Sequence, residues 1–408
     1  MTGFDTIIRL NRILSDLERG NQDLLVSFIK ETYDELGNEL INKIIFFIGI
    51  RPLKIEDYCI SIAKINNFAF KNSVIEFGNR KCPKLLFELF KIGWISMDEI
   101  EREILKYPTI LCQMYFYDIH KIFSQENYDY WGVSEFYEEK YVCAPDDHKD
   151  YKSFGFPRNS VQYAIKYDEI DEFKNHCTVT GFDMDQELES NPFEWSEINR
   201  FLSLLAFSAH FGSIKCFKFL IMSGVEPIEN DLDSVVFSGN LDIFHVYISE
   251  DEEELTRALP FSVNYFHFEL FEWIYSRIPI KNIDISELYQ SRNYEIINKL
   301  IEDGVDINKN GPKLMNDSSG EKTILHHACL NCDFQMCSML IAKGVFIDPQ
   351  DSFSSTPLLC ACEMGSVPIV DLLIQNGANI YEVDYSYKLF LMVITAFILH
   401  LESVIWIW

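Results

Sequence analysis

Apolar residues recur at helical spacing through the first part of the chain, from residue 4 to residue 117. Prolines and glycines interrupt this pattern at intervals that suit short helices. The opening stretch places its apolar residues on one helix face: Ile7, Ile8, Leu10, Ile13, Leu14 and Leu17. We therefore predict a helical N-terminal domain over residues 1–123, for which degenerate repeats are one interpretation. Residues 124–158 lack a regular pattern, and we predict that they form an irregular join between this domain and the rest of the chain.

Near the C-terminus one pattern occurs twice, with 33 residues between equivalent positions. The matching pairs are Thr323/Thr356, Leu325/Leu358, Ala328/Ala361, Cys329/Cys362, Leu340/Leu373 and Gly344/Gly377. Each copy predicts two short helices. Pro357 suits the first turn of a helix, because the N–H that proline lacks would be unpaired there. Gly344 and Gly377 follow the second helix, where a left-handed glycine commonly ends it.

The 33-residue period and the run Thr356-Pro357-Leu358 resemble the ankyrin repeat. The earlier copy keeps four residues of the same motif: Thr323, Leu325, His326 and Ala328. The resemblance implies an all-α fold, an ankyrin-type helical solenoid, because one repeat cannot cover its own apolar face and neighbours must stack. It also implies that partners bind at the hairpin tips and on the concave helix face.

Looser and shorter copies precede these two. Gly212 and Gly239 are 27 residues apart, Phe266 follows after another 27 and Arg292 after another 26, and each begins a similar apolar run. This spacing predicts degenerate ankyrin-like repeats over residues 159–308, built from helix pairs that are joined by tight turns.

Residues 309–322 are rich in Gly, Pro, Asn and Ser and predict an exposed loop insertion. Two regular repeats then occupy residues 323–388. This layout resembles the degenerate ankyrin-array families of parasitic protists, in which a divergent helical domain precedes short and then regular repeats. That resemblance implies a protein-binding scaffold.

The last twenty residues, 389–408, are mostly apolar and allow two interpretations. Their length suits a membrane anchor, but His400 and Glu402 interrupt the run, and a carboxylate is costly inside a bilayer. The run from His400 to Val404 also resembles the start of an ankyrin second helix. We favour a damaged or truncated final repeat and keep a membrane-associated protein as the alternative.

The chain is strongly acidic, with 63 Asp and Glu against 35 Lys and Arg and a formal charge of −28. Such a surface repels phosphate backbones, so we expect no nucleic-acid partner. A protein partner with a basic surface is its natural complement. Eleven cysteines without disulfide-like spacing, and an opening helix in place of a leader, predict a reduced, cytoplasmic compartment. The partner's identity and the oligomeric state stay open.

The densest group of soft metal ligands lies in the regular repeats: His326, His327, Cys329, Cys332, Cys337, Cys360 and Cys362. Cys329 and Cys332 have the spacing of half a zinc site. Repeat register explains them without a metal, because Cys329 and Cys362 fill equivalent small-residue positions and His326 belongs to the motif. No nucleophile–base motif and no phosphate-binding loop occurs. We therefore predict no metal, no cofactor and no catalytic site.

The ankyrin resemblance assigns candidate partner-binding residues to one hairpin and to the variable position of the first helices. They are His327, Asp348, Gln350, Asp351, Ser352, Phe353, Ser354 and Cys360. Phe353 is the best single anchor, because an apolar residue at a polar tip often marks an interface. The competing interpretation is that Phe353 packs back onto its own repeat. Together these features predict an interaction scaffold or adaptor without catalysis.

Overall fold

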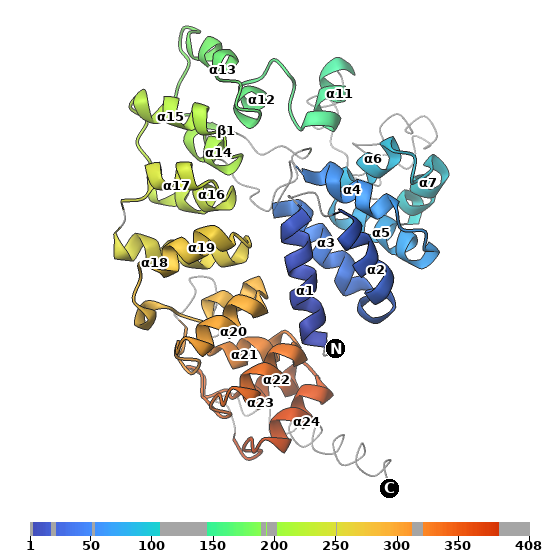
Figure 1. The fold of residues 1–408 in the computed structure, drawn as a ribbon, viewed down its shortest axis with the longest axis vertical. Coiled ribbons are helices and arrows are strands. Elements are labelled where there is room, and N and C mark those ends of the chain that lie inside the picture. Colours follow the sequence, from blue (N-terminus) through green and yellow to red (C-terminus); the bar gives the residue numbers. More distant parts are fainter. Residues whose placement is uncertain are drawn as a thin grey trace. The chain divides into compact units, whose positions relative to one another are not determined.

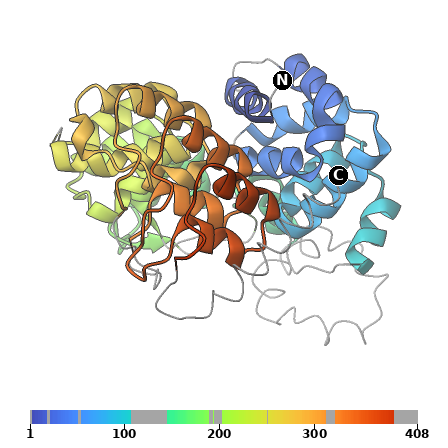
Figure 2. The same ribbon diagram turned by 90° about the horizontal axis from the view of Figure 1, so that it is seen from below.

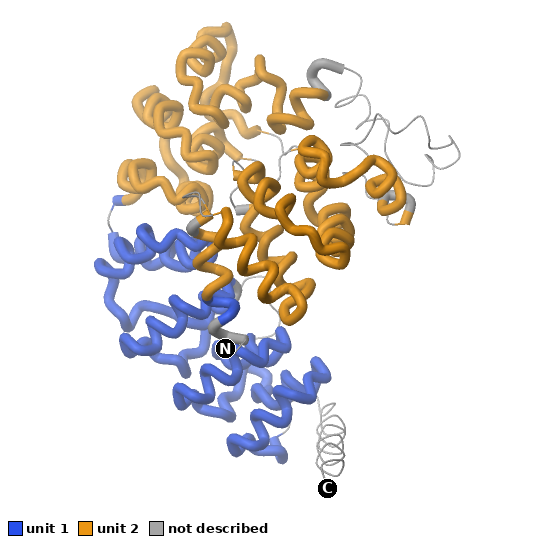
Figure 3. The backbone as a smooth tube through the Cα atoms, turned by 45° about the vertical axis from the view of Figure 1, so that its right-hand side comes forward, with its two compact units in different colours: residues 1–8, 249–408 blue, residues 9–248 orange. Residues whose placement is uncertain are grey.

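A computed structural model describes residues 3–17, 22–50, 54–106, 145–188, 193, 202–249, 251–311 and 321–382. The chain divides into two compact units: unit 2 comprises residues 9–248, and unit 1 comprises residues 1–8 and 249–408 (Figure 3). The apolar tail predicted at 389–408 lies outside the described residues, as does most of the join predicted at 124–158.

Short amphipathic helices form the N-terminal region, as predicted. They are α1 (Gly3–Asp16), α2 (Gln22–Leu36), α3 (Asn38–Ile50), α4 (Ile55–Ala63), α5 (Phe68–Lys81), α6 (Pro83–Lys91) and α7 (Met97–Lys106). Within unit 2, α2 packs on α4 and α4 on α6, while α3 packs on α5 and α5 on α7. The region is thus a two-column stack, which agrees with degenerate repeats. The domain boundary at residue 123 stays a prediction.

Unit 2 continues with helix pairs in which first helices pack on first helices and second helices on second helices (Figure 1). After α11 (Pro145–Phe154) the elements are α12 (Val161–Lys166), α13 (Ile170–Cys177), α14 (Leu204–His210), α15 (Ile214–Met222), η4 (Glu229–Asp231), α16 (Leu232–Phe237) and α17 (Leu241–Tyr247). Two short strands, β1 (Glu187–Leu188) and β2 (Leu202–Ser203), pair antiparallel just before α14, with Glu187 opposite Ser203.

Unit 1 repeats this arrangement (Figure 2). Its elements are α18 (Glu252–Asn264), α19 (Phe268–Tyr275), η5 (Ile280–Asn282), η6 (Glu287–Ser291), α20 (Tyr294–Glu302), α21 (Ile324–Leu330), α22 (Phe334–Ala342), α23 (Pro357–Glu363) and α24 (Val367–Gln375). Thr356 begins α23 by accepting the Leu359 N–H at 3.4 Å, and Pro357 occupies the first turn as predicted. The stripe formed by Ile369, Val370 and Leu373 is buried.

One backbone feature recurs in every helix pair of residues 161–375. The turn between the first and second helix contains a residue with positive φ: Asp168, Gly212, Gly239, Phe266, Arg292, Cys332 and Gly365. The faint copies predicted from spacing therefore begin at equivalent turns. Gly344 and Gly377 end the second helices with φ of 80° and 92°, as predicted. The predicted all-α fold of stacked repeats is confirmed.

Candidate protein-binding surface

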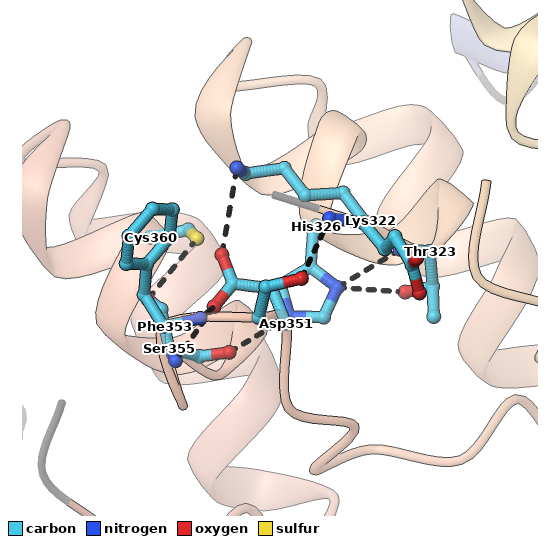
Figure 4. Close-up of polar contacts among 9 residues, drawn as sticks. Lys322, Thr323, His326, Asp351, Phe353, Ser355 and Cys360 are labelled. Carbon is cyan, nitrogen blue, oxygen red and sulfur yellow. Dashed lines mark hydrogen bonds and ion pairs between the residues drawn. The ribbon is translucent and has the colours of Figure 1, made fainter. Parts of the chain in front are cut away.

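The hairpin between α22 and α23 is anchored by a buried ion pair (Figure 4). The Asp351 carboxylate accepts the backbone N–H groups of Phe353 and Ser355, both at 2.9 Å. Its other oxygen lies 3.4 Å from Nζ of Lys322, and both side chains are almost fully buried. Because two N–H groups and a cation meet one carboxylate, the hairpin backbone is held in one conformation.

Lys322 was predicted to belong to an exposed loop insertion, and this prediction is wrong because its side chain lies in the interior. The backbone of the same residue closes the insertion: the Gly311 N–H donates to the Lys322 carbonyl at 2.9 Å. Gly311 is required there, because a Cβ would lie 2.1 Å from the Ser286 hydroxyl oxygen. The two ends of the inserted segment therefore meet at the base of the hairpin.

His326 joins the first helix of its repeat to the next hairpin. Nδ1 accepts the Thr323 N–H at 3.2 Å, so Nε2 carries the proton and donates to the Ser355 carbonyl at 3.0 Å. The Thr323 hydroxyl lies 2.8 Å from Nδ1. Burial lowers the pKa of His326 to about 4, so the ring is neutral at physiological pH. Its side chain is committed to holding the hairpin.

Neighbouring hairpins are also linked to one another. The Asp348 carboxylate accepts the Asn379 N–H at 3.1 Å, and the Asn308 side chain accepts the Phe346 N–H at 2.8 Å. In both cases the acceptor lies four residues after the glycine that ends a second helix. Burial raises the pKa of Asp348. Asp348 therefore connects two repeats and is only half-buried.

The predicted binding residues separate into two groups. Two predictions of exposure are wrong. Asp351 is 8% exposed because it anchors the hairpin, and Cys360 is 2% exposed because it lies on the buried side of α23. The remaining six are exposed or half-buried: His327, Asp348, Gln350, Ser352, Phe353 and Ser354. That they bind a partner stays a prediction.

Phe353 is the exposed apolar residue of this hairpin, at 46% exposure, and does not pack fully back onto its repeat. Ser352 beside it accepts the Glu321 N–H at 3.2 Å, and Gln350 donates to Glu382 at 3.1 Å. An apolar side chain with polar neighbours and two nearby acidic residues thus occupies the tip. The sequence analysis did not predict that Phe346, at the base of the hairpin, is exposed. The sequence indicates this residue only as an apolar side chain directly after Gly344 and Val345.

The cysteines of the regular repeats are largely interior. Sγ of Cys329 and Sγ of Cys337 lie 3.8 Å apart and buried, while Cys332 is exposed in the left-handed turn. Burial raises the pKa of Cys329 well above its usual value and that of Cys360 to about 12, so both are neutral thiols. Across the described ranges, no group of three or more His, Cys, Asp or Glu side chains is arranged to hold a metal ion.

A buried polar cluster joins the short repeat η6–α20 to the regular repeat α21–α22. The Asp333 carboxylate accepts the Tyr294 hydroxyl at 2.8 Å and the Tyr289 hydroxyl at 3.4 Å. It also caps α22 by accepting the Met336 N–H at 3.0 Å. Half-buried His327 stacks on the Tyr289 ring, with 6.0 Å between centroids. The short repeat is therefore built into the same array as the regular ones.

The family profile described as ankyrin repeats, in three copies, matches residues 287–384. This chain contains ankyrin repeats. The match begins at the first residue of η6, so its extent covers the pairs η6–α20, α21–α22 and α23–α24. The repeat whose inter-helix turn contains Arg292 is thus an ankyrin repeat, and the 3-10 helix η6 occupies the position of its first helix. Ankyrin repeats are protein-interaction modules, which supports the predicted binding function at this general level.

Similar curated proteins share only a small part of their length with this ankyrin-repeat chain. Palmitoyltransferase ZDHHC13 of Mus musculus is 34% identical over 99 residues, which are 24% of this chain and 15% of that protein. RelA-associated inhibitor of Mus musculus is 33% identical over 86 residues, 20% of this chain and 10% of that protein. The crystal structure of the ankyrin repeat domain of Bcl-3 aligns with a TM-score of 0.36 and 18% identity, covering 47% of this chain and 93% of that domain.

None of the helices in the described part of the chain combines the length and apolar character that crossing a bilayer requires. The membrane anchor that was weighed against a damaged repeat falls at residues 389–408, outside that part.

Proposed function

We propose that this chain is a protein-interaction scaffold or adaptor, and that the hairpin at residues 348–355 is a partner-binding surface with Phe353 at its centre. The observation that carries the proposal is an exposed phenylalanine on a backbone fixed by the buried pair Lys322–Asp351. A rigid apolar anchor loses little conformational entropy when it binds, and such anchors dominate the energy of many interfaces.

The exposed polar residues Ser352 and Gln350 would form the rim of this surface, and the half-buried His327 an adjoining contact on α21. The partner we propose presents a basic face. Glu321 and Glu382 adjoin the tip through their contacts with Ser352 and Gln350, and the chain carries a formal charge of −28. Opposite charge at a rim speeds association and excludes wrong partners more than it adds affinity.

The scaffold we propose is cytoplasmic and carries out no catalysis. The buried acidic, imidazole and thiol groups described above are committed to caps, hairpin anchors and packing. In particular, His326 and Asp351 form the hairpin contacts that a repeat array needs, and the thiol of Cys329 is inert because it is buried and neutral.

The test places a photo-reactive amino acid at Ser352 of the full chain, to cross-link and identify a partner from cell lysate. Binding of the purified partner to wild type and to Phe353→Ala is then measured by calorimetry. We expect Kd to rise at least about 10-fold, or about 1.4 kcal/mol. Phe334→Ala, at a similarly exposed phenylalanine that begins α22, is the matched control and should leave Kd unchanged. Equal affinities of wild type and Phe353→Ala would refute the hairpin assignment.

A further inference from the structure

A second exposed apolar surface lies in the degenerate repeats, at the hairpin between α15 and α16. Met222 is 86% exposed at the end of α15, and Ile228 is 55% exposed on the hairpin. The Tyr247 hydroxyl of α17 donates to the Ile228 carbonyl at 2.8 Å, and α15 packs on α17. Val246, beside that tyrosine, is also exposed. We name the hairpin and the adjoining end of α15 the 222–231 surface, with Met222 and Ile228 as its exposed apolar residues.

A buried aspartate also holds the backbone of this hairpin. Buried Asp231 accepts the Ile228 N–H at 3.0 Å and lies 3.4 Å from the hydroxyl of Ser203, which caps α14. Burial raises the pKa of Asp231. Two hairpins in different units thus use the same device, a buried aspartate beneath an exposed apolar residue. Because Asp231 fixes the backbone of Ile228, the exposed side chain of this residue is held in place before a partner binds.

The charged residues within the segment 222–231 are all acidic. Residues 219–248, which belong to the same unit, contain five Asp and Glu and no Lys or Arg. Glu226 and Glu229 flank Ile228 and are exposed. Lys218, one helical turn before Met222, is the nearest cation in the sequence on that side. Anionic lipid and nucleic acid are repelled by such a surface, whereas a segment that combines apolar residues with Lys and Arg complements both of its properties.

We infer that the 222–231 surface docks a basic amphipathic segment of a partner protein. Apolar side chains of that segment cover Met222 and Ile228, and its Lys or Arg residues pair with Glu226 and Glu229. This surface is separate from the hairpin at 348–355, so the chain carries two docking surfaces of similar construction, one in each unit.

The experiment uses the full chain and a fluorescent synthetic peptide with leucine on one helix face and lysine on the other. Binding is followed by anisotropy at about 0.15 M salt, where weak long-range attraction is screened. Two comparison peptides separate the contributions: one replaces each leucine by serine, the other replaces each lysine by glutamate. We expect the first to bind at least about 10-fold more weakly than the leucine–lysine peptide and the second not to bind, because both contributions are required.

Two variants locate the site. The double substitution Met222→Ser and Ile228→Ser should weaken binding of the leucine–lysine peptide at least about 10-fold, and Glu226→Gln with Glu229→Gln should weaken it several-fold. All four side chains are exposed, so the fold should survive, which circular dichroism checks. The matched control, Phe68→Ser with Val179→Ser at two exposed apolar residues elsewhere in the same unit, should leave this binding unchanged.

Unchanged affinity in the Met222→Ser/Ile228→Ser variant would overturn the inference, as would equal binding of the serine–lysine peptide. A third variant, Phe346→Ser with Phe353→Ser, tests the other surface: if it alone loses affinity, the peptide occupies the hairpin at 348–355. That result would also overturn this inference while supporting the proposed function, so the two proposals fail separately.

Discussion

Two buried histidines show how the regular and degenerate repeats differ. His326 lies on the first helix α21, and both of its ring nitrogens have hydrogen-bond partners in Thr323 and Ser355. His210 ends the first helix α14 and is buried as well, but neither nitrogen has a partner among the described residues. Its ring instead stacks on Phe237 of α16, with 3.9 Å between centroids.

The difference shows that one helix-pair architecture can be joined by two kinds of contact. In the regular repeats, a polar clamp of His326 and Lys322 fixes the hairpin at 348–355 that leads into the following repeat. In the degenerate repeats around α14 and α16, Asp231 still holds the hairpin, but aromatic packing takes the place of the histidine contact. The His210 ring stacks on Phe237 and lies edge-on to Phe211. Polar clamps specify geometry, whereas ring packing tolerates change in sequence. This explains why the repeat motif remains readable in one region and fades in the other.

The largest expected effect comes from breaking the clamp of the regular repeats. Lys322→Met leaves the Asp351 charge buried without its cation, which should lower the free energy of unfolding by about 3–5 kcal/mol. Urea unfolding monitored by circular dichroism measures it. Lys343→Met removes an exposed pair with Glu302 and should change stability by less than about 1 kcal/mol. A loss below about 1 kcal/mol for Lys322→Met would show that the clamp is not what holds the hairpin.

An intermediate effect is expected from acid in the degenerate repeats. Burial lowers the pKa of His210 from 6.5 to about 3. Below pH 6.5 the unfolded chain therefore binds a proton at His210 that the folded chain does not bind. As a result, the free energy of unfolding is unaffected by this group above pH 6.5 and decreases as pH falls from 6.5 towards 3. Between pH 7.5 and pH 5 this group alone should remove about 2 kcal/mol.

The variant His210→Leu should abolish that part of the pH dependence and should not destabilise the protein at pH 7.5, because an unpartnered imidazole gains nothing from burial. His245→Leu, at an exposed histidine on α17, is the control and should keep the wild-type slope. The measurement is urea unfolding at pH 7.5 and at pH 5. An unchanged slope in His210→Leu would mean that packing around the ring adjusts to the charge.

The smallest expected change in stability comes from substitutions at the positive-φ residue between the first and second helix of a repeat. Cys332 is exposed with φ of 53°, where the next repeat has Gly365 at φ of 69°. Cys332→Gly removes left-handed strain and should stabilise the protein by up to about 1 kcal/mol. Phe266 has φ of 57° in the degenerate region but is buried, so Phe266→Gly should destabilise by more than it relieves. Thermal unfolding distinguishes these opposite signs, and Cys332→Ala, which keeps the strain, is the control.

The sequence predicted the repeat positions well because they depend on local chemistry. The glycines and the apolar spacing are local features, and even Phe266 and Arg292, neither of them glycine, were located by the period alone. The lengths of first helices were not predictable in this way. The 3-10 turn η6 stands where a helix was expected, and the buried contacts of Asp333 together with the family match show that its repeat belongs with the regular ones.

The candidate surface was predicted less completely, because exposure is decided by contacts between distant residues. Asp351 lies in a polar run that resembles an exposed tip, yet it pairs with Lys322, which lies beyond a whole helix pair in sequence. Lys322 itself follows a stretch whose composition indicates a loop. For Phe353 the sequence leaves two interpretations open, an exposed anchor or packing onto its own repeat, and the structure shows a side chain that is 46% exposed.

The bond between the Gly311 N–H and the Lys322 carbonyl makes the inserted segment a closed side branch of the chain. Its ends stay joined whatever lies between them, and lengthening such a loop costs only about 0.6 kcal/mol for each doubling. An epitope, a fluorescent reporter or a small folded domain can therefore be spliced in at this place without separating the repeats on either side. The protein thus offers a natural position for a label with which binding at both proposed docking surfaces can be followed in living cells.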